Sequence, residues 1–305
     1  MHQSVAKAGV APDLNGIASF PSVVEIQTHG RCNAACSCCP YDSVSESTRA
    51  NRMSDELLAA ILDECATNRH RIAQLVPYHN NEPFLDVRML DILRFIRTRI
   101  EVPVELSTNV SALTPSTIAS LVTEALASTL RVSFFGATRE TYEARMKLPF
   151  DRATKNLRNL LEASRNSSVD VEVVMIASGD LTQTEVDLCR SMWEPLGAKV
   201  NIFGYLDRAG TSSEINFLPF AARKRPVVGC DLNRPFERMC ILSDGSTVIC
   251  SQDWLRETNL GNVRDDGIAA VWNGNAYAAL RATMRGTGAF ASDFLCRRCK
   301  LAIFE

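Results

Sequence analysis

The sequence predicts an α/β fold followed by a smaller C-terminal domain that is rich in cysteine. Between residues 21 and 205, short β-rich runs alternate six times with helical patterns, as is typical of parallel strands joined by right-handed crossovers. Hydrophobic residues make up 46% of the 305 residues, enough for a sizeable buried core. Most of the eleven cysteines fall into two groups, at 32–39 and 230–299. The alternation alone fits either an open doubly wound sheet or a complete or partial barrel.

Each strand and helix in the series has a local signal. The first strand is VVEIQT (23–28), and the helix of residues 54–67 carries a stripe of apolar side chains behind Ser54, a good N-cap residue. Another helix is expected to open at Thr114-Pro115, because proline suits the first helical position. The remaining strands are expected at 72–79, 102–108, 130–135, 169–177 and 199–205, and the remaining helices at 86–99, near 152–166 and near 182–195.

The chain divides into four segments on this pattern. They are an N-terminal leader (1–20), the α/β domain (21–205), a linker of mixed polarity (206–228) and a C-terminal α+β domain (229–305). In the last segment Asp244-Gly245 predicts the turn of a hairpin. A helix is expected near 267–285.

Charge and hydropathy exclude several classes of partner. The 33 basic and 35 acidic residues leave a net charge of −2, which offers no electrostatic basis for binding nucleic acid or an anionic membrane. No apolar run reaches the ~18–20 residues of a membrane span, and the N-terminus lacks the apolar stretch of a secretory signal. We therefore expect a cytoplasmic protein. In that compartment thiols stay reduced, and clustered cysteines indicate metal binding or catalysis.

The first cysteine group is a C-x3-C-x2-C motif formed by Cys32, Cys36 and Cys39. Three thiolates can hold three irons of a four-iron cluster and leave the fourth iron without a protein ligand. A structural zinc site would need four ligands, with Cys38 as the fourth. A contiguous loop of this shape is uncommon for zinc, so the spacing favours an iron–sulfur cluster.

In this motif the chain resembles the radical S-adenosylmethionine (SAM) superfamily. The resemblance implies a partial (β/α)6 TIM-like barrel with its chemistry at the C-terminal ends of the strands. It also implies a 4Fe–4S cluster on the three cysteines and SAM on the open iron. The family usually has an aromatic residue before the third cysteine. Here that position is Cys38, and Tyr41 is expected to compensate near the adenine.

Further positions fit the same family pattern. The segment His79-Asn80-Asn81-Glu82-Pro83 follows the second strand, where the family has a Gly-Gly-Glu-Pro element that binds the methionine amino group. The resemblance therefore places SAM contacts at two strand ends: Asn81, Glu82 and Pro83 after the second strand, and Ser107, Thr108 and Asn109 after the third. For His79 both a structural role and a substrate contact stay open.

The second cysteine group contains the paired-ligand spacing Cys296-x2-Cys299, which by itself fits zinc and iron–sulfur equally. Residues 230–299 resemble the twitch domain, a reduced form of the SPASM domain that carries an auxiliary cluster. The resemblance implies a second 4Fe–4S cluster on Cys230, Cys250, Cys296 and Cys299. Cys240 is then left over, although it could replace Cys230 as a ligand. Cys65 and Cys189 are expected in the core.

With its length and a single auxiliary cluster, the chain resembles radical SAM epimerases and dehydrogenases of aminoglycoside biosynthesis. The resemblance implies abstraction of a hydrogen atom from a carbinol carbon of a small sugar or aminocyclitol. We predict epimerisation with hydrogen return from Cys240; the alternatives are dehydrogenation through the auxiliary cluster and, less favoured, maturation of a ribosomal peptide. An external one-electron reductant such as flavodoxin or ferredoxin is expected, and Arg152, Asp253 and Trp254 are candidate substrate contacts. A zinc-binding interaction module and a non-catalytic iron–sulfur carrier are the alternatives outside radical chemistry.

Overall fold

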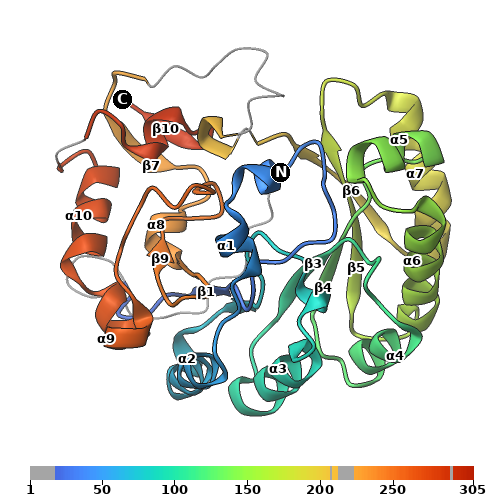
Figure 1. The fold of residues 1–305 in the computed structure, drawn as a ribbon, viewed down its shortest axis with the longest axis horizontal. Coiled ribbons are helices and arrows are strands. Elements are labelled where there is room, and N and C mark those ends of the chain that lie inside the picture. The colour runs from blue at the N-terminus through green and yellow to red at the C-terminus, as the bar shows by residue number, and fades with distance from the viewer. Residues whose placement is uncertain (1–17, 207, 212–222, 289–290) are drawn as a thin grey trace.

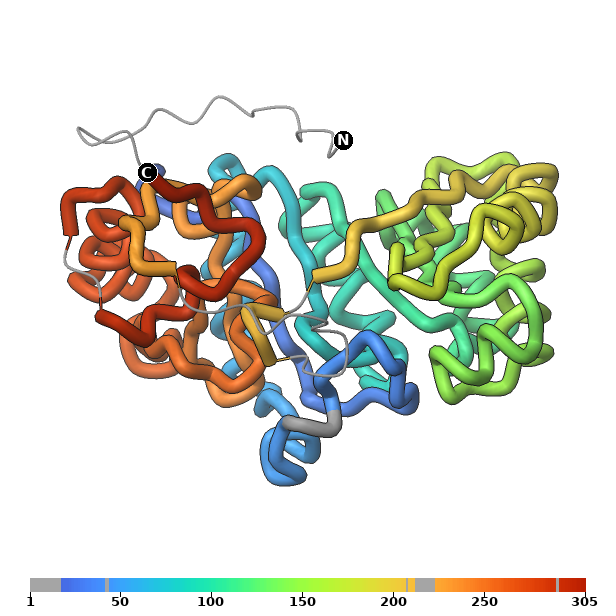
Figure 2. Tube along the Cα trace, turned by 90° about the horizontal axis from the view of Figure 1, so that it is seen from above, coloured from blue at the N-terminus to red at the C-terminus, as the bar shows by residue number. Residues whose placement is uncertain are grey.

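A computed structural model describes residues 18–206, 208–211, 223–288 and 291–305. Most of the expected leader (1–20) and the middle of the expected linker (206–228) lie outside these residues. The molecule is elongated, with the C-terminal segment (orange to red) at one end and the green-to-yellow part of the chain, about residues 140–200, at the other (Figure 2). The segment that follows the first strand lies between these two ends (Figures 1 and 2).

Six parallel strands form the partial barrel. They are β1 (Val23–Ile26), β2 (Gln74–Val76), β3 (Glu105–Thr108), β4 (Thr129–Ser133), β5 (Asp170–Ala177) and β6 (Lys199–Gly204). Neighbouring strands pair in parallel in chain order, and an isolated parallel bridge from Leu75 to Val104 links β2 to β3. The structure therefore confirms the predicted partial barrel and all six strands of the series.

Helices cover the outer face of the barrel (Figure 1). They are α2 (Asp55–Thr67), α3 (Met89–Phe95) with its π-helical continuation η4 (Ile96–Ile100), α4 (Pro115–Thr123), α6 (Phe150–Ser164) and α7 (Gln183–Trp193). The side chains of Ser54 and Thr114 cap α2 and α4 as predicted, accepting hydrogen bonds from backbone N–H groups in the first turn.

The sequence analysis missed two short helices, α1 (Glu46–Ala50) and α5 (Arg139–Met146). Helix α5 has little apolar periodicity, but Thr138 and Thr141 form a capping box at its start. Single-turn helices connect other elements: η1 (Pro40–Ser43), η2 (Arg69–Arg71), η3 (Pro83–Leu85), η5 (Glu194–Leu196), η6 (Arg208–Gly210) and η8 (Leu295–Arg298).

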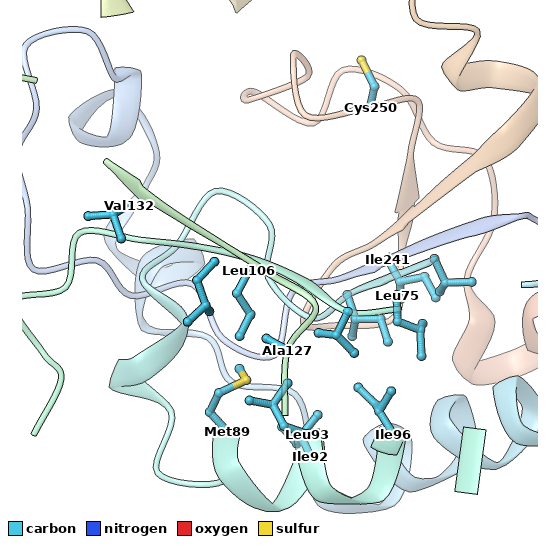
Figure 3. Packing of buried hydrophobic residues seen from close by; sticks show 14 of the residues in the cluster. Leu75, Met89, Ile92, Leu93, Ile96, Leu106, Ala127, Val132, Ile241 and Cys250 are labelled. Carbon is cyan, nitrogen blue, oxygen red and sulfur yellow. The ribbon is translucent and has the colours of Figure 1, made fainter. Parts of the chain in front are cut away.

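The main core lies between the sheet and the helices. In Figure 3, Leu75 and Leu106 from the strands face Met89, Leu93 and Ile96 from α3 and η4. These five side chains are at most 1% exposed, and burying each contributes roughly 1.5–3 kcal/mol. Cys65 and Cys189 are also buried in this core, as predicted. The core holds the strand ends in place, and the functional side chains project from those ends.

The C-terminal segment joins the barrel sheet directly. Strand β8 (Arg238–Ile241) pairs in parallel with β1, and β9 (Thr247–Val248) pairs antiparallel with β8 around the expected Asp244-Gly245 turn. The pairing of β8 with β1 was not predicted, because strands 215 residues apart carry no local sign of their partner. It brings residues of the expected auxiliary domain beside the first barrel strand.

The rest of this segment forms a small layer of its own. It contains β7 (Val227–Cys230), α8 (Arg234–Glu237), α9 (Val263–Trp272), α10 (Asn275–Met284) and β10 (Ala302–Phe304), with β7 antiparallel to β10. The single helix expected near 267–285 is wrong, because the chain forms two helices that break at Asn273-Gly274. Within the described residues, every helix is too short or too polar to cross a membrane. The cytoplasmic location stays a prediction.

Candidate active site

The C-x3-C-x2-C loop follows β1 at the C-terminal edge of the barrel. Cys32, Cys36 and Cys39 are partly buried there. Burial, and after it the charges of Glu82 and Cys39, raise the pKa of Cys32 to about 12. Burial, together with the charges that Cys38, Cys39 and Cys32 would carry, raises the pKa of Cys36 well above its usual value.

Backbone and side-chain contacts hold this loop in shape. The Tyr41 hydroxyl accepts a hydrogen bond from Cys32 N at 2.8 Å and donates one to Gly30 O at 3.1 Å. Gly30 lies so close to α1 that a Cβ atom added to it would be 2.3 Å from Thr48 O. Only glycine fits there without a backbone shift. Tyr41 thus fixes the start of the cysteine loop, and its predicted contact with adenine stays a prediction.

The residues predicted to contact SAM after β2 and β3 lie together. Glu82 is 2% exposed, and its carboxylate accepts hydrogen bonds from Thr108 Oγ1 at 2.7 Å and Asn109 N at 2.8 Å. Burial raises the pKa of Glu82 to about 7, although these bonds oppose the rise. Pro83 follows as the first residue of η3. Glu82 therefore joins the ends of two strands.

The neighbouring polar side chains tie these strand ends to the cysteine loop. Asn109 Nδ2 donates to Asn33 Oδ1 at 2.9 Å, and Glu82 N donates to Arg31 O at 3.0 Å. Asn81 Oδ1 accepts from His79 N at 2.8 Å, while Ser107 is partly exposed on β3. Glu82, Thr108 and Asn109 thus form one network with the cysteine loop, and the contacts of the predicted set with SAM stay a prediction.

Four cysteines of the second group line one small apolar cavity in the C-terminal segment. They are Cys230, Cys250, Cys296 and Cys299, and their neighbours around the cavity include Pro235, Ile249 and Met284. The N–H groups of Gln252 and Leu301 donate to the sulfurs of Cys250 and Cys299 at 3.5 and 3.4 Å. Figure 3 shows Cys250 well apart from the barrel core. Four convergent thiols among apolar side chains, with N–H···S contacts, fit an iron–sulfur cluster.

Cys240 does not line that cavity. It lies on β8 at 0% exposure, and its thiol donates to Glu25 Oε2 at 3.6 Å. Burial and the charge of Glu25 raise the pKa of Cys240 well above its usual value. Glu25 in turn contacts Arg238 Nη1 at 2.6 Å and His79 Nδ1 at 2.7 Å. Burial would raise the pKa of Glu25, but Arg238 and His79 outweigh burial and lower it far below its usual value.

Sequence analysis missed Glu25 and Arg238. A signal for Glu25 was present, because a carboxylate interrupts the otherwise apolar start of VVEIQT. Arg238 carried no such signal. Its significance depends on the pairing of β8 with β1, where Val23 lies opposite Arg238 and Glu25 lies opposite Cys240.

A second cavity lies between the cysteine loop and the C-terminal segment. Its lining residues come from four separate stretches of chain: Gln27, Gly30, Tyr41, Val44 and Thr48; His79 and Asn80; Leu242; and Asp253, Trp254 and Arg256. Gln27 and Leu242 are each two residues beyond Glu25 and Cys240, on the same face of parallel strands. Cys240 therefore lies on the strand beneath Leu242, a residue of this pocket lining.

The candidate substrate contacts have different positions relative to this pocket. Trp254 lines it, and its indole Nε1 has no hydrogen-bond partner in the described residues. Asp253 also lines it, but its carboxylate accepts hydrogen bonds from Glu257 N at 2.8 Å and Thr258 N at 2.9 Å, which hold the following loop. Arg152 is exposed on α6 and lies outside the pocket lining.

Comparison with known proteins decides the family. The model of the radical SAM superfamily matches residues 26–186, more than half of the chain. The chain belongs to the radical SAM superfamily. A second family model, SPASM, described as an iron–sulfur cluster-binding domain, matches residues 230–300. The radical SAM identity and the SPASM-type C-terminal segment are therefore confirmed.

Solved structures of radical SAM proteins share the fold at low sequence identity. BtrN in complex with AdoMet and 2-DOIA is 17% identical, with a TM-score of 0.60 over 92% of this chain and 93% of that one. SuiB of Streptococcus suis bound to precursor peptide SuiA is 13% identical, with a TM-score of 0.68 over 93% of this chain and 71% of that one. anSMEcpe with bound AdoMet is 14% identical, with a TM-score of 0.64 over 91% of this chain and 82% of that one. None of the curated protein sequences matches this chain.

Membership of the radical SAM superfamily carries two consequences. The protein uses a 4Fe–4S cluster and SAM, and its SPASM segment implies at least one auxiliary cluster. The thiol sets described above fit such groups, because thiolate sulfur is the ligand that iron–sulfur clusters take. The similar structures, at 17% identity or less, support the fold alone.

Proposed function

We propose that the protein is a radical SAM epimerase of a small sugar or aminocyclitol. Cys32, Cys36 and Cys39 would hold the SAM-binding 4Fe–4S cluster, and Cys230, Cys250, Cys296 and Cys299 would hold one auxiliary 4Fe–4S cluster. When bound, the first cluster and SAM supply a 5′-deoxyadenosyl radical that removes a hydrogen atom from the substrate. Asn81, Glu82, Pro83, Ser107, Thr108, Asn109 and Tyr41 would position SAM at the strand ends.

The position of Cys240 carries this proposal. An epimerase must return a hydrogen atom to the face of the substrate carbon opposite to abstraction, so it needs a donor with a weak bond to hydrogen. Cys240 is a buried thiol beneath the polar pocket, and its high pKa keeps it in the S–H form. It also lies outside the four-cysteine cavity, so it is available as a donor rather than a ligand.

The polar lining of the pocket supports a small hydrophilic substrate. Gln27, Thr48 and Asn80 provide amide and hydroxyl groups suited to sugar hydroxyls. Among the described residues, Arg256 is the only arginine or lysine in the lining and Asp253 the only carboxylate. This balance does not select a strongly cationic substrate, so the candidate substrates include neutral and acidic sugars beside aminocyclitols.

Dehydrogenation of the same carbon is a second candidate, supported by the position of Arg234. Arg234 lines the cavity of the four auxiliary cysteines, and it begins α8, which leads directly into the strand that carries Cys240. This short connection between the auxiliary thiols and β8 supports an electron-accepting role for an auxiliary cluster. Such an enzyme would oxidise the carbinol to a carbonyl group.

The test is turnover in deuterated water. The anaerobically reconstituted enzyme is incubated with SAM, reductant and a panel of sugars, aminocyclitols and short peptides. Product mass and stereochemistry are then measured. We expect inversion at one carbon with one solvent deuterium at that carbon. We also expect Cys240→Ala to abolish inversion while 5′-deoxyadenosine still forms. Cys65→Ala, which removes a buried thiol far from the pocket, is the matched control.

Other products would decide against the epimerase. A product that lacks two hydrogens and carries no deuterium identifies a dehydrogenase, and turnover of peptides alone identifies a peptide-modifying enzyme. Full epimerisation by Cys240→Ala would remove Cys240 from the donor role. Flavodoxin and ferredoxin serve as the reductants in a parallel set of reactions, because an external one-electron donor is part of the proposal.

A further inference from the structure

Three side chains are buried together beneath the pocket, and the partly buried Arg238 completes the group. Glu25 is 4%, His79 1% and Cys240 0% exposed, and Arg238 is packed against Glu25. Burying charged groups between strands is costly unless they are paired, and apolar side chains would fill this space at lower cost. None of the proposed cluster ligands belongs to this group. Its arrangement therefore calls for a function of its own.

The group forms one continuous chain of contacts. The Cys240 thiol donates to Glu25 Oε2 at 3.6 Å, and His79 Nδ1 lies 2.7 Å from Glu25 Oε1. Arg238 Nη1 donates to Glu25 Oε2 at 2.6 Å. The carboxylate of Glu25 thus lies between the imidazole and the thiol, and the guanidinium keeps it ionised and able to accept.

The far end of the chain reaches the pocket. His79 lines the pocket together with Asn80, whose Nδ2 lies 3.4 Å from His79 Nε2. Gln27 Nε2 donates to the His79 carbonyl oxygen at 2.9 Å and holds this residue against β1. The imidazole therefore has one nitrogen toward the carboxylate and the other toward the pocket side.

We propose that His79, Glu25 and Arg238 are positioning residues that hold Cys240 as a protonated thiol and return a proton to it after each hydrogen-atom donation. This inference rests on the proposed epimerase function and extends it. The negative carboxylate beside the sulfur orients the S–H bond. It also disfavours a thiolate, which could not donate a hydrogen atom.

The chemical balance of the cycle is as follows. The S–H bond of Cys240 breaks homolytically, and the hydrogen atom forms a C–H bond with the substrate radical. The sulfur radical left behind takes up one electron from the external one-electron reductant and one proton. The proton enters His79 at Nε2 from the pocket, the Nδ1 proton passes to Glu25, and the carboxyl group passes a proton to the sulfur. Glu25 and Cys240 then have their starting protonation, while His79 carries its proton on Nε2, and a half-turn of the imidazole about the Cβ–Cγ bond presents an N–H group to Glu25 again.

A metal ion is the competing explanation for the cluster. One ligand atom each from Glu25, His79 and Cys240 lie within 4.8 Å of one another. The Arg238 guanidinium, 2.6 Å from Glu25, already supplies the positive charge at this position and would repel a cation. The proton relay from His79 through Glu25 to Cys240, with Arg238 as the partner of Glu25, accounts for all four residues. A metal site leaves Arg238 unexplained.

The first experiment measures the thiol itself and needs no substrate. The holoenzyme is alkylated with iodoacetamide across a range of pH, and modification of Cys240 is read by peptide mass spectrometry. Glu25→Gln removes the negative charge beside the sulfur. We expect Cys240 to react at least about tenfold faster at a given alkaline pH in this variant, as for a thiol pKa about one unit lower. Equal profiles in the two proteins would overturn the proposal.

The second experiment measures proton return with the substrate identified by the panel. In His79→Gln we expect the steady-state rate to be at least about tenfold lower than the first-turnover rate of the same variant, whereas the wild type shows no such gap. His70→Gln, at an exposed histidine on η2, is the matched control. A first turnover of His79→Gln that is slowed as much as its later turnovers overturns the relay. The relay is also overturned if the wild-type protein holds one equivalent of divalent metal and the Cys240→Ala variant does not. A wild-type product without deuterium instead refutes the epimerase function itself.

Glu25→Gln leaves the Arg238 guanidinium without its ion-pair partner, which destabilises the folded state. The double variant Glu25→Gln/Arg238→Met therefore removes both charges together. We expect the same faster alkylation of Cys240 in the double variant. An alkylation profile equal to that of the wild type would overturn the proposal in this background too.

Discussion

Replacing Glu82 by glutamine should change how the stability of the protein depends on pH. The Glu82 carboxylate is 2% exposed and accepts hydrogen bonds from Thr108 and Asn109, and burial raises its pKa from 4.5 to about 7. The folded state therefore binds the Glu82 proton more tightly than the unfolded state does. The resulting stability is fully present below about pH 4.5, falls as pH rises, and is lost above about pH 7.

The size of the effect follows from that pKa difference. Each pKa unit corresponds to about 1.4 kcal/mol, so the loss across this pH range is about 3 kcal/mol. Unfolding entropy scales with chain length, so for 305 residues 3 kcal/mol corresponds to about 5 °C in melting temperature. Glutamine does not titrate, so Glu82→Gln should lack this part of the pH dependence.

The assay is anaerobic thermal unfolding of the reconstituted protein between about pH 5 and pH 8. Most of the expected pH-dependent loss of stability falls in this range. The measured quantity is the difference in melting temperature between wild type and variant at each pH. It should change by about 4 °C in favour of the variant as pH rises, because a part of the loss has already occurred at pH 5. Glu56→Gln, at an exposed carboxylate on α2, is the control. Parallel curves for wild type and Glu82→Gln would refute the assignment of a raised pKa to Glu82.

Three further outcomes are expected. Gly30→Ala places a Cβ atom 2.3 Å from a carbonyl oxygen of α1, so it should distort the cysteine loop. The iron content should then fall by about four iron atoms per chain, and an unchanged iron content would refute the tight fit of Gly30. Cys296→Ala should lose the auxiliary cluster from the absorption spectrum while Cys240→Ala retains it; equal iron loss in both would make Cys240 a ligand. Arg238→Met removes one partner of the buried Glu25 carboxylate, so it should lower the free energy of unfolding by about 3–5 kcal/mol in chemical denaturation. A decrease below about 1 kcal/mol would contradict the pairing of Arg238 with Glu25.

Local patterns predicted much of the fold. The six barrel strands and the caps at Ser54 and Thr114 were predicted because strand runs and N-caps depend on residues close in sequence. The helix near 267–285 failed, because the break at Asn273-Gly274 depends on how two helices pack rather than on their apolar content. Helix α5 was missed since its stability comes from capping and packing, with little apolar periodicity.

The sequence by itself determined the chemistry of the cysteines. The spacing of Cys32, Cys36 and Cys39 identifies an iron–sulfur loop, because ligands in one short loop are placed by local geometry. The family matches then confirmed the radical SAM fold and a SPASM segment. The spacing of the second group fits zinc and iron–sulfur equally. The resemblance to twitch domains implies four auxiliary ligands there, and those four thiols line one cavity.

Only the tertiary structure decided the surroundings of Cys240. Its contacts with Glu25 and the proximity of His79 depend on the parallel pairing of β8 with β1, which joins residues 215 positions apart. Strand pairing over that distance is set by the packing of the whole barrel and leaves no periodic trace in either strand. The thiol that sequence analysis treated as left over therefore lies beside a buried carboxylate, imidazole and guanidinium, beneath the pocket.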